Sequence, residues 1–357
     1  MNILYLISFA GKSGTEKYVQ TLMERFSAEG HTCHLVYQTA GALSETMETA
    51  GFPVRQMDLR PAHIFAAARE LADYCRRNNI DVIHAQYPRE NVIAVLAARR
   101  RRMKVVFTSH LTIEQGLVWR VLNRFVTPRD DCVISVCREG VELLKKNGVC
   151  PERIRMIGNG IEVKPPKEKN RAVLAPLGVE AGTYVFIALL RYAPEKGIDT
   201  LLHACAELKG RKKGAFVCLL AGDGELFDEA TDRIRALELT DTVLQLGYRT
   251  DAEALLHAAD AYVSSAIYNE AMSFAVLEAM AASLPLIVTD VGAGVSLSEG
   301  CGLAVKSGSA VLLADAMETL LTDPEKGRAL GTAARQKLER EYDLTEQTKK
   351  IMEVYRK

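Results

Sequence analysis

The feature that most constrains the fold is a regular alternation of short aliphatic segments with longer helical patterns. The first part of the chain has seven aliphatic segments, at residues 2–9, 32–37, 54–58, 81–84, 105–109, 132–136 and 154–157. Helical patterns separate most of them, for example at residues 15–29 and 61–78. Continuous apolar strands that alternate with helices are typical of a parallel sheet covered on both faces.

The alternation stops once and then restarts. Residues 160–170 form a highly charged stretch with two adjacent prolines, Pro165 and Pro166, which is typical of a linker. Six aliphatic segments follow, at residues 184–190, 215–220, 243–246, 261–264, 286–289 and 303–305, and helical patterns close the chain from residue 309. The sequence therefore predicts two doubly wound α/β domains, at residues 1–164 and 170–342. Such sheets bind ligands at the carboxyl ends of their strands.

Composition limits the class of protein. The chain has 357 residues, 48% hydrophobic and 25% charged, as in soluble globular proteins. It has no apolar run of ~18 residues, the length that a membrane span needs. Its start is predicted to be a strand rather than a signal peptide. None of the eight cysteines forms a CxxC pair. These features favour a cytoplasmic protein.

The charge is divided unevenly along the chain. Residues 1–164 have 23 basic and 17 acidic side chains, a net charge of +6, and residues 165–357 have a net charge of −6. This asymmetry suggests different partners for the two halves. The excess is too modest to indicate nucleic-acid binding.

A glycine-containing turn follows the first predicted strand, at residues 10–16. Free backbone N–H groups at a helix start favour an anion, and Gly14 has no Cβ that would keep a phosphate away. The turn matches neither the GxGxxG pattern of dinucleotide-binding proteins nor a P-loop. An ordinary strand-to-helix turn is the alternative.

Two cationic side chains follow the first strand of the second predicted domain. Arg191 and Lys196 lie five residues apart across a turn that contains Pro194. A guanidinium fork and an ammonium group at a strand end suit a diphosphate. The alternative is a solvated loop.

Two glutamates with seven residues between them form the strongest pattern. Glu270 is predicted to lie in a loop after the strand at residues 261–264, and Glu278 in the next helix. A carboxylate just inside a helix can accept hydrogen bonds from two vicinal ribose hydroxyls, and the helix start can hold a phosphate. The alternative is a pair of acidic residues that complement the helix dipole.

These glutamates resemble the EX7E motif of the retaining GT-B nucleotide-sugar glycosyltransferases, the family called group 1 or family four. Residues 191–197 resemble its Arg-x4-Lys-Gly phosphate clamp, and residues 11–16 resemble its glycine-rich turn. Further stretches fit in the same order, at residues 81–84, 108–110, 157–161, 222–224 and 285–290. The resemblance covers nearly the whole chain. It implies two Rossmann-like domains that face each other across a cleft, with a C-terminal helix at residues 344–357 that packs on the first domain.

The resemblance also implies a role for each matched residue. Glu278 would hold the nucleotide ribose, and Glu270 would bind hydroxyls of the transferred sugar. Arg191 and Lys196 would neutralise the departing diphosphate. The other matched residues are Gly14 beside the phosphates, Tyr248 beside the base, the backbone of Met272, Ser273 and Phe274 near the sugar, and His110, which would approach the donor sugar. His110, Arg191, Lys196 and Glu270 would be the catalytic residues.

Charge development indicates how such a reaction proceeds. Breaking the anomeric bond places negative charge on the departing nucleotide diphosphate, and preorganised cations stabilise that charge most in the transition state. The sequence has no DxD pattern and no His/Asp cluster with metal-ligand spacing. We therefore expect no metal and no cofactor beyond the nucleotide-sugar co-substrate. Ala271 and Leu190 stand where the family usually has glycine, which leaves the donor sugar open.

The resemblance places the acceptor on the basic first domain. A run of arginines occupies residues 99–102, and one helical stripe contains Ile113, Leu117, Val121 and Phe125, with Trp119, Arg120 and Arg124 beside it. Basic and apolar side chains together suit an anionic membrane surface. The alternatives are arginines that complement a helix dipole and a stripe that packs on the sheet.

The sequence thus predicts a metal-independent retaining glycosyltransferase that uses a nucleotide-diphosphate sugar, expected to be UDP-linked. Its expected acceptor is a glycan or a lipid-linked intermediate of bacterial cell-surface polysaccharide synthesis, and its expected place is the cytoplasm, with a peripheral position on the inner face of the membrane. Two alternatives stay open: a transferase with a soluble small acceptor, and a catalytically silent GT-B-like binding subunit.

Overall fold

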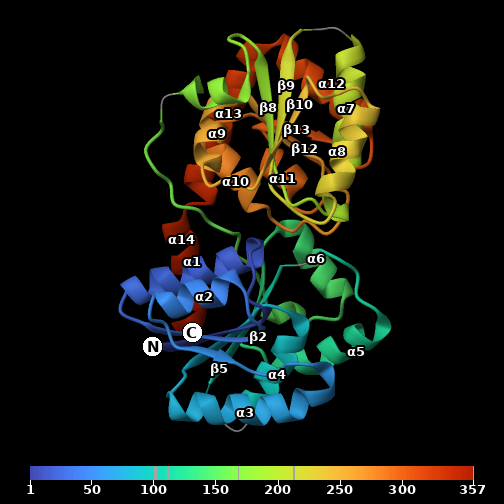
Figure 1. The fold of residues 1–357 in the computed structure, drawn as a ribbon. Helices are drawn as coiled ribbons and strands as arrows, with labels where there is room; N and C mark the ends of the chain where they lie inside the picture. Colours follow the sequence, from blue (N-terminus) through green and yellow to red (C-terminus); the bar gives the residue numbers. More distant parts are fainter. Residues whose placement is uncertain (100–102, 111, 168, 212–213, 357) are drawn as a thin grey trace. The chain divides into compact units, whose positions relative to one another are not determined.

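The computed structural model describes residues 1–99, 103–110, 112–167, 169–211 and 214–356 (Figure 1). Contacts divide the chain into two compact units. The first unit contains Met1–Asn159 with Thr345–Lys357, and the second contains Gly160–Leu344. Each unit has one fully parallel sheet flanked by helices. The two-domain α/β architecture predicted from the sequence is therefore confirmed.

The first unit has a seven-stranded sheet in the order β3-β2-β1-β4-β5-β6-β7. Its strands are β1 (Asn2–Phe9), β2 (Thr32–Thr39), β3 (Val54–Gln56), β4 (Val82–Ala85), β5 (Lys104–Ser109), β6 (Cys132–Ser135) and β7 (Ile154–Met156). Its helices are α1 (Gly14–Ala28), α2 (Ala42–Thr49), α3 (Ile64–Arg77), α4 (Pro88–Ala98), α5 (Leu117–Val126), α6 (Arg138–Lys146) and α14 (Leu344–Arg356). The middle strands are almost wholly buried, because helices cover both faces.

The second unit has a six-stranded sheet in the order β10-β9-β8-β11-β12-β13. Its strands are β8 (Tyr184–Leu189), β9 (Phe216–Ala221), β10 (Val243–Gly247), β11 (Ala261–Ser264), β12 (Leu286–Thr289) and β13 (Gly302–Val305). Its helices are α7 (Ile198–Arg211), α8 (Phe227–Ala236), α9 (Ala252–Ala258), α10 (Phe274–Ala281), α11 (Gly294–Ser298), α12 (Ala310–Thr322) and α13 (Pro324–Glu341).

Strand order locates the point in each sheet where a ligand is expected. In both sheets the first strand in sequence lies between the second and the fourth, so the chain changes direction across the sheet there. The connections from these strands run to opposite faces, which leaves a crevice at their carboxyl ends. In the first unit this point lies between β1 and β4. In the second it lies between β8 and β11.

The segment 160–164, which the sequence analysis placed in the first domain, makes its contacts in the second unit. The Ile161 N–H donates to the Tyr342 carbonyl at 3.1 Å, and Ile161 bridges to Asp343. The Arg335 guanidinium of α13 also donates to the Lys164 carbonyl. Backbone pairing with the end of α13 therefore holds this segment beside the start of α14.

The C-terminal helix α14 belongs to the first unit although it follows the second unit in sequence. Tyr355 is fully buried there, and its hydroxyl lies 2.6 Å from His84 Nδ1 on β4. The Lys104 ammonium donates to the Tyr355 carbonyl at 2.9 Å. No helix in the described part of the chain is long and apolar enough to span a bilayer.

Candidate active site

The phosphate-clamp residues lie at the carboxyl end of β8 in the second unit. β8 ends at Leu189, and the chain then turns through Arg191 and the short 3-10 turn Pro194–Lys196 into α7. The Arg191 guanidinium pairs with the Glu195 carboxylate, yet 60% of the Arg191 side chain stays exposed. The cation is thus oriented at the strand end while remaining accessible.

Backbone packing shapes this loop and its neighbour. Gly222 has φ +147°, and a Cβ at this position would lie 1.7 Å from the Leu190 carbonyl oxygen. Gly292 has φ +52°, and a Cβ there would lie 1.4 Å from the Glu270 carbonyl oxygen. Only glycine permits such close approach, so these two residues fix the backbone beside Arg191 and under Glu270.

The structure pairs two residues to which the sequence analysis gave separate roles. The Lys196 ammonium contacts the Glu270 carboxylate across the junction between β8 and β11. The loops are also joined through backbone, because the Ser265 hydroxyl donates to the Lys196 carbonyl at 2.8 Å and the Ile267 N–H to the Glu195 carbonyl at 2.8 Å. The side chains of Lys196 and Glu270 are only 24% and 20% exposed. The pair is held rigidly at the crevice.

The second glutamate of the motif lies on α10, as predicted. Glu278 is half-buried on the second turn of this helix, whereas Glu270 lies in the preceding loop. Burial, and then the negative charges of Glu270 and Glu278, raise the pKa of the Tyr262 hydroxyl on β11. The Tyr262 hydroxyl donates to the Leu189 carbonyl at 3.4 Å, at the end of β8. The charges of both glutamates therefore act on this end of the sheet.

The start of α10 has the form expected of an anion-binding helix terminus. Ser273 is its N-cap residue, with no capping hydrogen bond from its side chain, and Met272 and Phe274 on either side are buried. A small pocket beside it is lined by Glu270, Ala271, Ser273 and residues of β12 and α11. Tyr248 lies directly after β10 and is exposed.

The predicted residues of the first unit lie at its own switch point. Gly14 is the first residue of α1, directly after the turn that follows β1. One helical turn later, the Tyr18 ring lies 4.9 Å from the His110 ring in an edge-on contact. His110 follows β5, and its Nε2 atom lies 2.9 Å from Gln86 Oε1. Burial lowers the pKa of His110 to about 3, so its imidazole is neutral at pH 7.

A buried chain of polar groups lies beneath His110. Thr108 Oγ1 lies 3.3 Å from the Tyr18 hydroxyl and 2.6 Å from His84 Nε2. The other nitrogen of His84 contacts the Tyr355 hydroxyl, which donates to the Tyr5 hydroxyl at 3.4 Å. Burial, followed by the charge of His110, lowers the pKa of His84 to about 3. A neutral imidazole completes this network by donating from Nδ1 and accepting at Nε2.

Sequence reasoning missed several polar residues at the two sites. In the first unit, Gln86 positions His110, and buried Glu90 on the first turn of α4 contacts Ser8 and Arg89. In the second unit, Glu195 pairs with Arg191. Three of these residues could have been found from their positions in the sequence. Ser8, Gln86 and Glu90 all lie at or just beyond the carboxyl ends of β1 and β4, where such sheets bind ligands.

The apolar stripe on α5 does not pack on the sheet. Leu117 is 76% and Phe125 is 67% exposed, and Ile113, Val118 and Val121 are exposed beside them. The inner face of α5 is polar instead, because Asn123 is buried and donates to the Asn147 carbonyl at 2.8 Å. The alternative of a core-facing stripe is therefore wrong. In the basic run, Arg99 is the C-cap residue of α4, while residues 100–102 lie outside the described part of the chain.

The described residues contain no group of three or more His, Cys, Asp or Glu side chains that could hold a metal ion. The counter-charges found at the second-unit crevice are the side chains of Arg191 and Lys196.

Comparison with known families matches both halves of the chain. Residues 169–337 match the family described as "Glycosyl transferases group 1", and residues 12–164 match "Glycosyltransferase Family 4". Among solved structures, Alr3699/HepE of Anabaena in complex with UDP superposes with a TM-score of 0.87 at 20% identity, covering 99% of both chains. This likeness supports the GT-B fold.

Individual relatives are 23–26% identical in sequence and match most of the chain. EpsD of Bacillus subtilis, assigned as a glycosyltransferase, is 26% identical over 87% of this chain and 85% of its own. N-acetyl-alpha-D-glucosaminyl L-malate synthase of Bacillus anthracis is 26% identical over 77% and 74%. UDP-Gal:alpha-D-GlcNAc-diphosphoundecaprenol alpha-1,3-galactosyltransferase of Escherichia coli is 23% identical over 78% and 76%. With its two family matches, its two parallel-sheet domains and its EX7E glutamates, the chain belongs to the group 1 glycosyltransferases, enzymes that use nucleotide sugars.

Proposed function

We propose that the chain transfers a sugar from a UDP-linked donor to a glycan or lipid-linked acceptor in bacterial cell-surface polysaccharide synthesis, with retention of anomeric configuration and without a metal ion. The observation that carries the donor-side proposal is the placement of two cations, Arg191 and Lys196, after β8, with Lys196 paired to Glu270 and Glu278 on the helix that follows. The UDP complex of the Anabaena structure and the UDP-sugar in the name of the Escherichia coli relative support the choice of base.

The donor would replace contacts that the protein makes without it. Arg191 and Lys196 would hold the diphosphate, and Lys196 would exchange its contact with Glu270 for a phosphate oxygen. Glu270, released from that ion pair, would accept hydrogen bonds from hydroxyls of the sugar. Negative charge grows on the diphosphate as the anomeric bond breaks, so both cations act most strongly in the transition state.

The other residues would orient the donor. Glu278 would accept hydrogen bonds from the ribose hydroxyls, and Tyr248 would border the base. The backbone N–H groups of Met272, Ser273 and Phe274 would face the sugar or phosphate at the start of α10. From the first unit, Gly14 would approach the phosphates and neutral His110 would bind the transferred sugar.

Replacing Glu278 with alanine tests the nucleotide site. Loss of two charge-assisted hydrogen bonds should weaken UDP binding by roughly 2–3 kcal/mol, on the order of 30- to 150-fold. Calorimetry with UDP, GDP and ADP would measure the change and identify the base. Glu299→Ala, which removes an exposed carboxylate in the same unit, is the control and should bind UDP as the wild type does. Unchanged affinity of Glu278→Ala for all three nucleotides would refute the ribose assignment.

The exposed face of α5 favours a lipid-linked acceptor over a soluble one. This helix is attached to the first unit through its polar side and presents its apolar side outward, the reverse of an ordinary surface helix. Exposed Arg124, Lys145 and Lys146 lie on α5 and α6 of the same unit. Apolar side chains with neighbouring cations suit the interface of an anionic membrane. The malate-linked product in the name of one relative keeps a soluble acceptor as the second candidate.

Removing the apolar side chains of α5 should release the protein from anionic vesicles. The double variant Leu117→Ser with Phe125→Ser loses two exposed apolar groups, each contributing roughly 1 kcal/mol or more to insertion, so binding should fall at least tenfold. Co-sedimentation with phosphatidylglycerol and phosphatidylcholine vesicles is the measurement. Phe65→Ser is the matched control, because Phe65 is 74% exposed on α3 of the same unit. Equal, negligible binding of the wild type to both vesicles would contradict the membrane proposal.

A further inference from the structure

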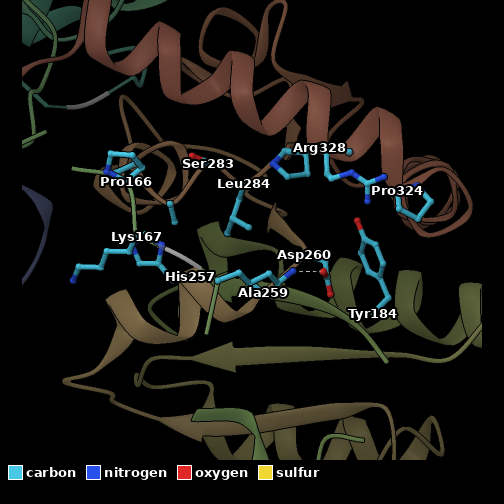
Figure 2. Close-up of a pocket in the computed structure, with 15 residues that line it drawn as sticks. Pro166, Lys167, Tyr184, His257, Ala259, Asp260, Ser283, Leu284, Pro324 and Arg328 are labelled. Carbon is cyan, nitrogen blue, oxygen red and sulfur yellow. Dashed lines mark hydrogen bonds and ion pairs between the residues drawn. The ribbon is translucent and has the colours of Figure 1, made fainter. Parts of the chain in front are cut away.

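A second pocket lies at the amino end of the sheet in the second unit. Its lining includes Tyr184, the first residue of β8, and Pro285, just before β12, and the first turns of α13 form its roof (Figure 2). Its volume is about 360 Å³, which is within the range of small-molecule sites. Arg191 and Lys196 follow the opposite end of β8, so this pocket is separate from the donor site.

Part of the pocket lining is apolar and rigid. Three prolines contribute to its lining, Pro166, Pro285 and Pro324, together with Leu284. The Tyr184 ring is itself held in place, because it packs against the Phe186 ring with centroids 4.9 Å apart. These groups offer a preformed surface for the flat or aliphatic body of a ligand.

The lining also carries an excess of positive charge, with Lys167 at one end and Arg328 at the other (Figure 2). It includes three permanent cations, Lys167, Lys169 and Arg328, and one carboxylate, Asp260. Asp260 is already occupied by Lys169, by Arg171 at 2.9 Å and by the Val185 N–H at 2.8 Å. It therefore cannot neutralise the remaining cations.

Two polar groups of the lining, Arg328 and the Tyr184 hydroxyl, make few other contacts. The Arg328 guanidinium has a single ion pair among the described residues, with Glu325 at 3.8 Å, and both side chains are largely exposed. Such a pair contributes little. The Tyr184 hydroxyl has no hydrogen bond within the described part of the chain, and a Cβ at Gly327 would lie 3.8 Å from it. Figure 2 shows this hydroxyl directed toward Arg328.

His257 lies in the pocket lining together with Lys167. Burial lowers the pKa of His257, the nearby Lys167 charge lowers it further, and the Glu253 charge opposes this shift. Lys167 pairs with Glu253 at 2.5 Å on the surface side, an exposed contact that a more highly charged anion can replace.

We propose that this pocket binds a small phosphate ester, a sugar phosphate or a nucleoside monophosphate. Arg328 and the Tyr184 hydroxyl would donate to the phosphoryl oxygens, and Lys167, at the other end of the pocket, would add to the positive charge around the ester. A phosphomonoester carries a charge close to −2 at pH 7, so a lining with more cations than carboxylates favours it over a singly charged carboxylate. The apolar wall would hold the body of the ester.

Calorimetry on the full-length protein tests this proposal. Glucose 1-phosphate, AMP and inorganic phosphate are titrated separately, each with and without excess UDP. We expect one of the two esters to bind more tightly than inorganic phosphate, and its binding to survive UDP. Arg328→Ala and Tyr184→Phe should each weaken that ester about tenfold or more, because each removes a donor to a charged group. Lys326→Ala is the control, since it removes an exposed cation two residues away on α13.

Each outcome of these titrations supports or refutes the phosphate-ester site. Esters that bind only without UDP, or that are weakened by Lys196→Ala rather than Arg328→Ala, occupy the donor site, and the proposal fails. Binding no tighter than that of inorganic phosphate, or no binding by any probe, overturns the ligand class. A wild type that neither binds UDP nor releases it from UDP-sugars would refute the proposed function without affecting the comparison between Arg328→Ala and Lys326→Ala.

Discussion

Lys196→Ala should lower kcat for UDP release from UDP-sugars by at least about 10²- to 10³-fold, with a smaller effect on the affinity for the donor. The reason is that Lys196 faces the charge that grows on the diphosphate as the sugar leaves. The substitution also leaves the Glu270 carboxylate without its cation, which disturbs the sugar site. The assay is UDP release from UDP-glucose, UDP-galactose and UDP-N-acetylglucosamine in excess EDTA, without acceptor.

Two controls are needed to interpret the effect of Lys196→Ala on the rate. Lys209→Ala removes a lysine of the same unit that pairs with Asp241 far from the crevice, and it should leave the rate unchanged. Wild-type turnover should survive EDTA, because Arg191 and Lys196 would supply the counter-charge that a metal ion provides elsewhere. If EDTA stops the wild type, Mn²⁺ or Mg²⁺ restores it and Lys196→Ala stays active, these side chains are not the main counter-charge. A wild type that never releases UDP would favour the silent binding subunit.

The largest effect on stability is expected at Tyr355. Replacing this fully buried side chain with alanine leaves a large cavity in the first unit and an unsatisfied His84 nitrogen, so the unit should lose roughly 3–5 kcal/mol. Tyr355→Phe keeps the volume and loses only the hydroxyl, so it should cost about 1–3 kcal/mol. Native-state hydrogen exchange of β1 and β4 amides measures both, because a two-domain chain need not unfold in one step.

The exchange experiment has an internal comparison. Amides of β8 and β11 in the second unit should keep their protection in both variants, because α14 belongs to the first unit. Tyr268→Ala removes a tyrosine that is 49% exposed and should change stability by no more than about 0.5 kcal/mol. Loss of protection in β8 rather than in β1 would show that the C-terminal helix stabilises the other unit.

Local patterns predicted the fold well because parallel strands are buried on both faces. All thirteen predicted strands are present, with ends displaced by at most two residues, as at β3 (Val54–Gln56). The predicted helix at residues 61–78 begins later, at Ile64, because Pro61 starts a short 3-10 turn, Pro61–His63, ahead of α3. The ends of strands are harder to predict from sequence than their presence, since hydrogen bonding to neighbouring strands decides where each strand ends.

The sequence analysis located four charged residues at strand and helix ends of the second unit but did not predict how they pair. Arg191, Lys196, Glu270 and Glu278 could be found because each follows a strand of a parallel sheet or opens the next helix. The ion pair between Lys196 and Glu270 joins residues 74 positions apart. No local pattern encodes such a contact, which exists only because β8 and β11 are adjacent in the sheet.

The sequence by itself determined two parallel-sheet domains, their order along the chain and the charged residues at their strand ends. Periodicity and turn chemistry are local, so a linear chain displays them. The tertiary structure alone decided that the stripe on α5 faces outward, because polar contacts of Asn123 with Asn147 hold its opposite side. It also decided that Tyr355 supports His84 and that a basic pocket opens at the amino end of the second sheet. These features depend on which distant segments meet, and hydrophobic periodicity does not specify that.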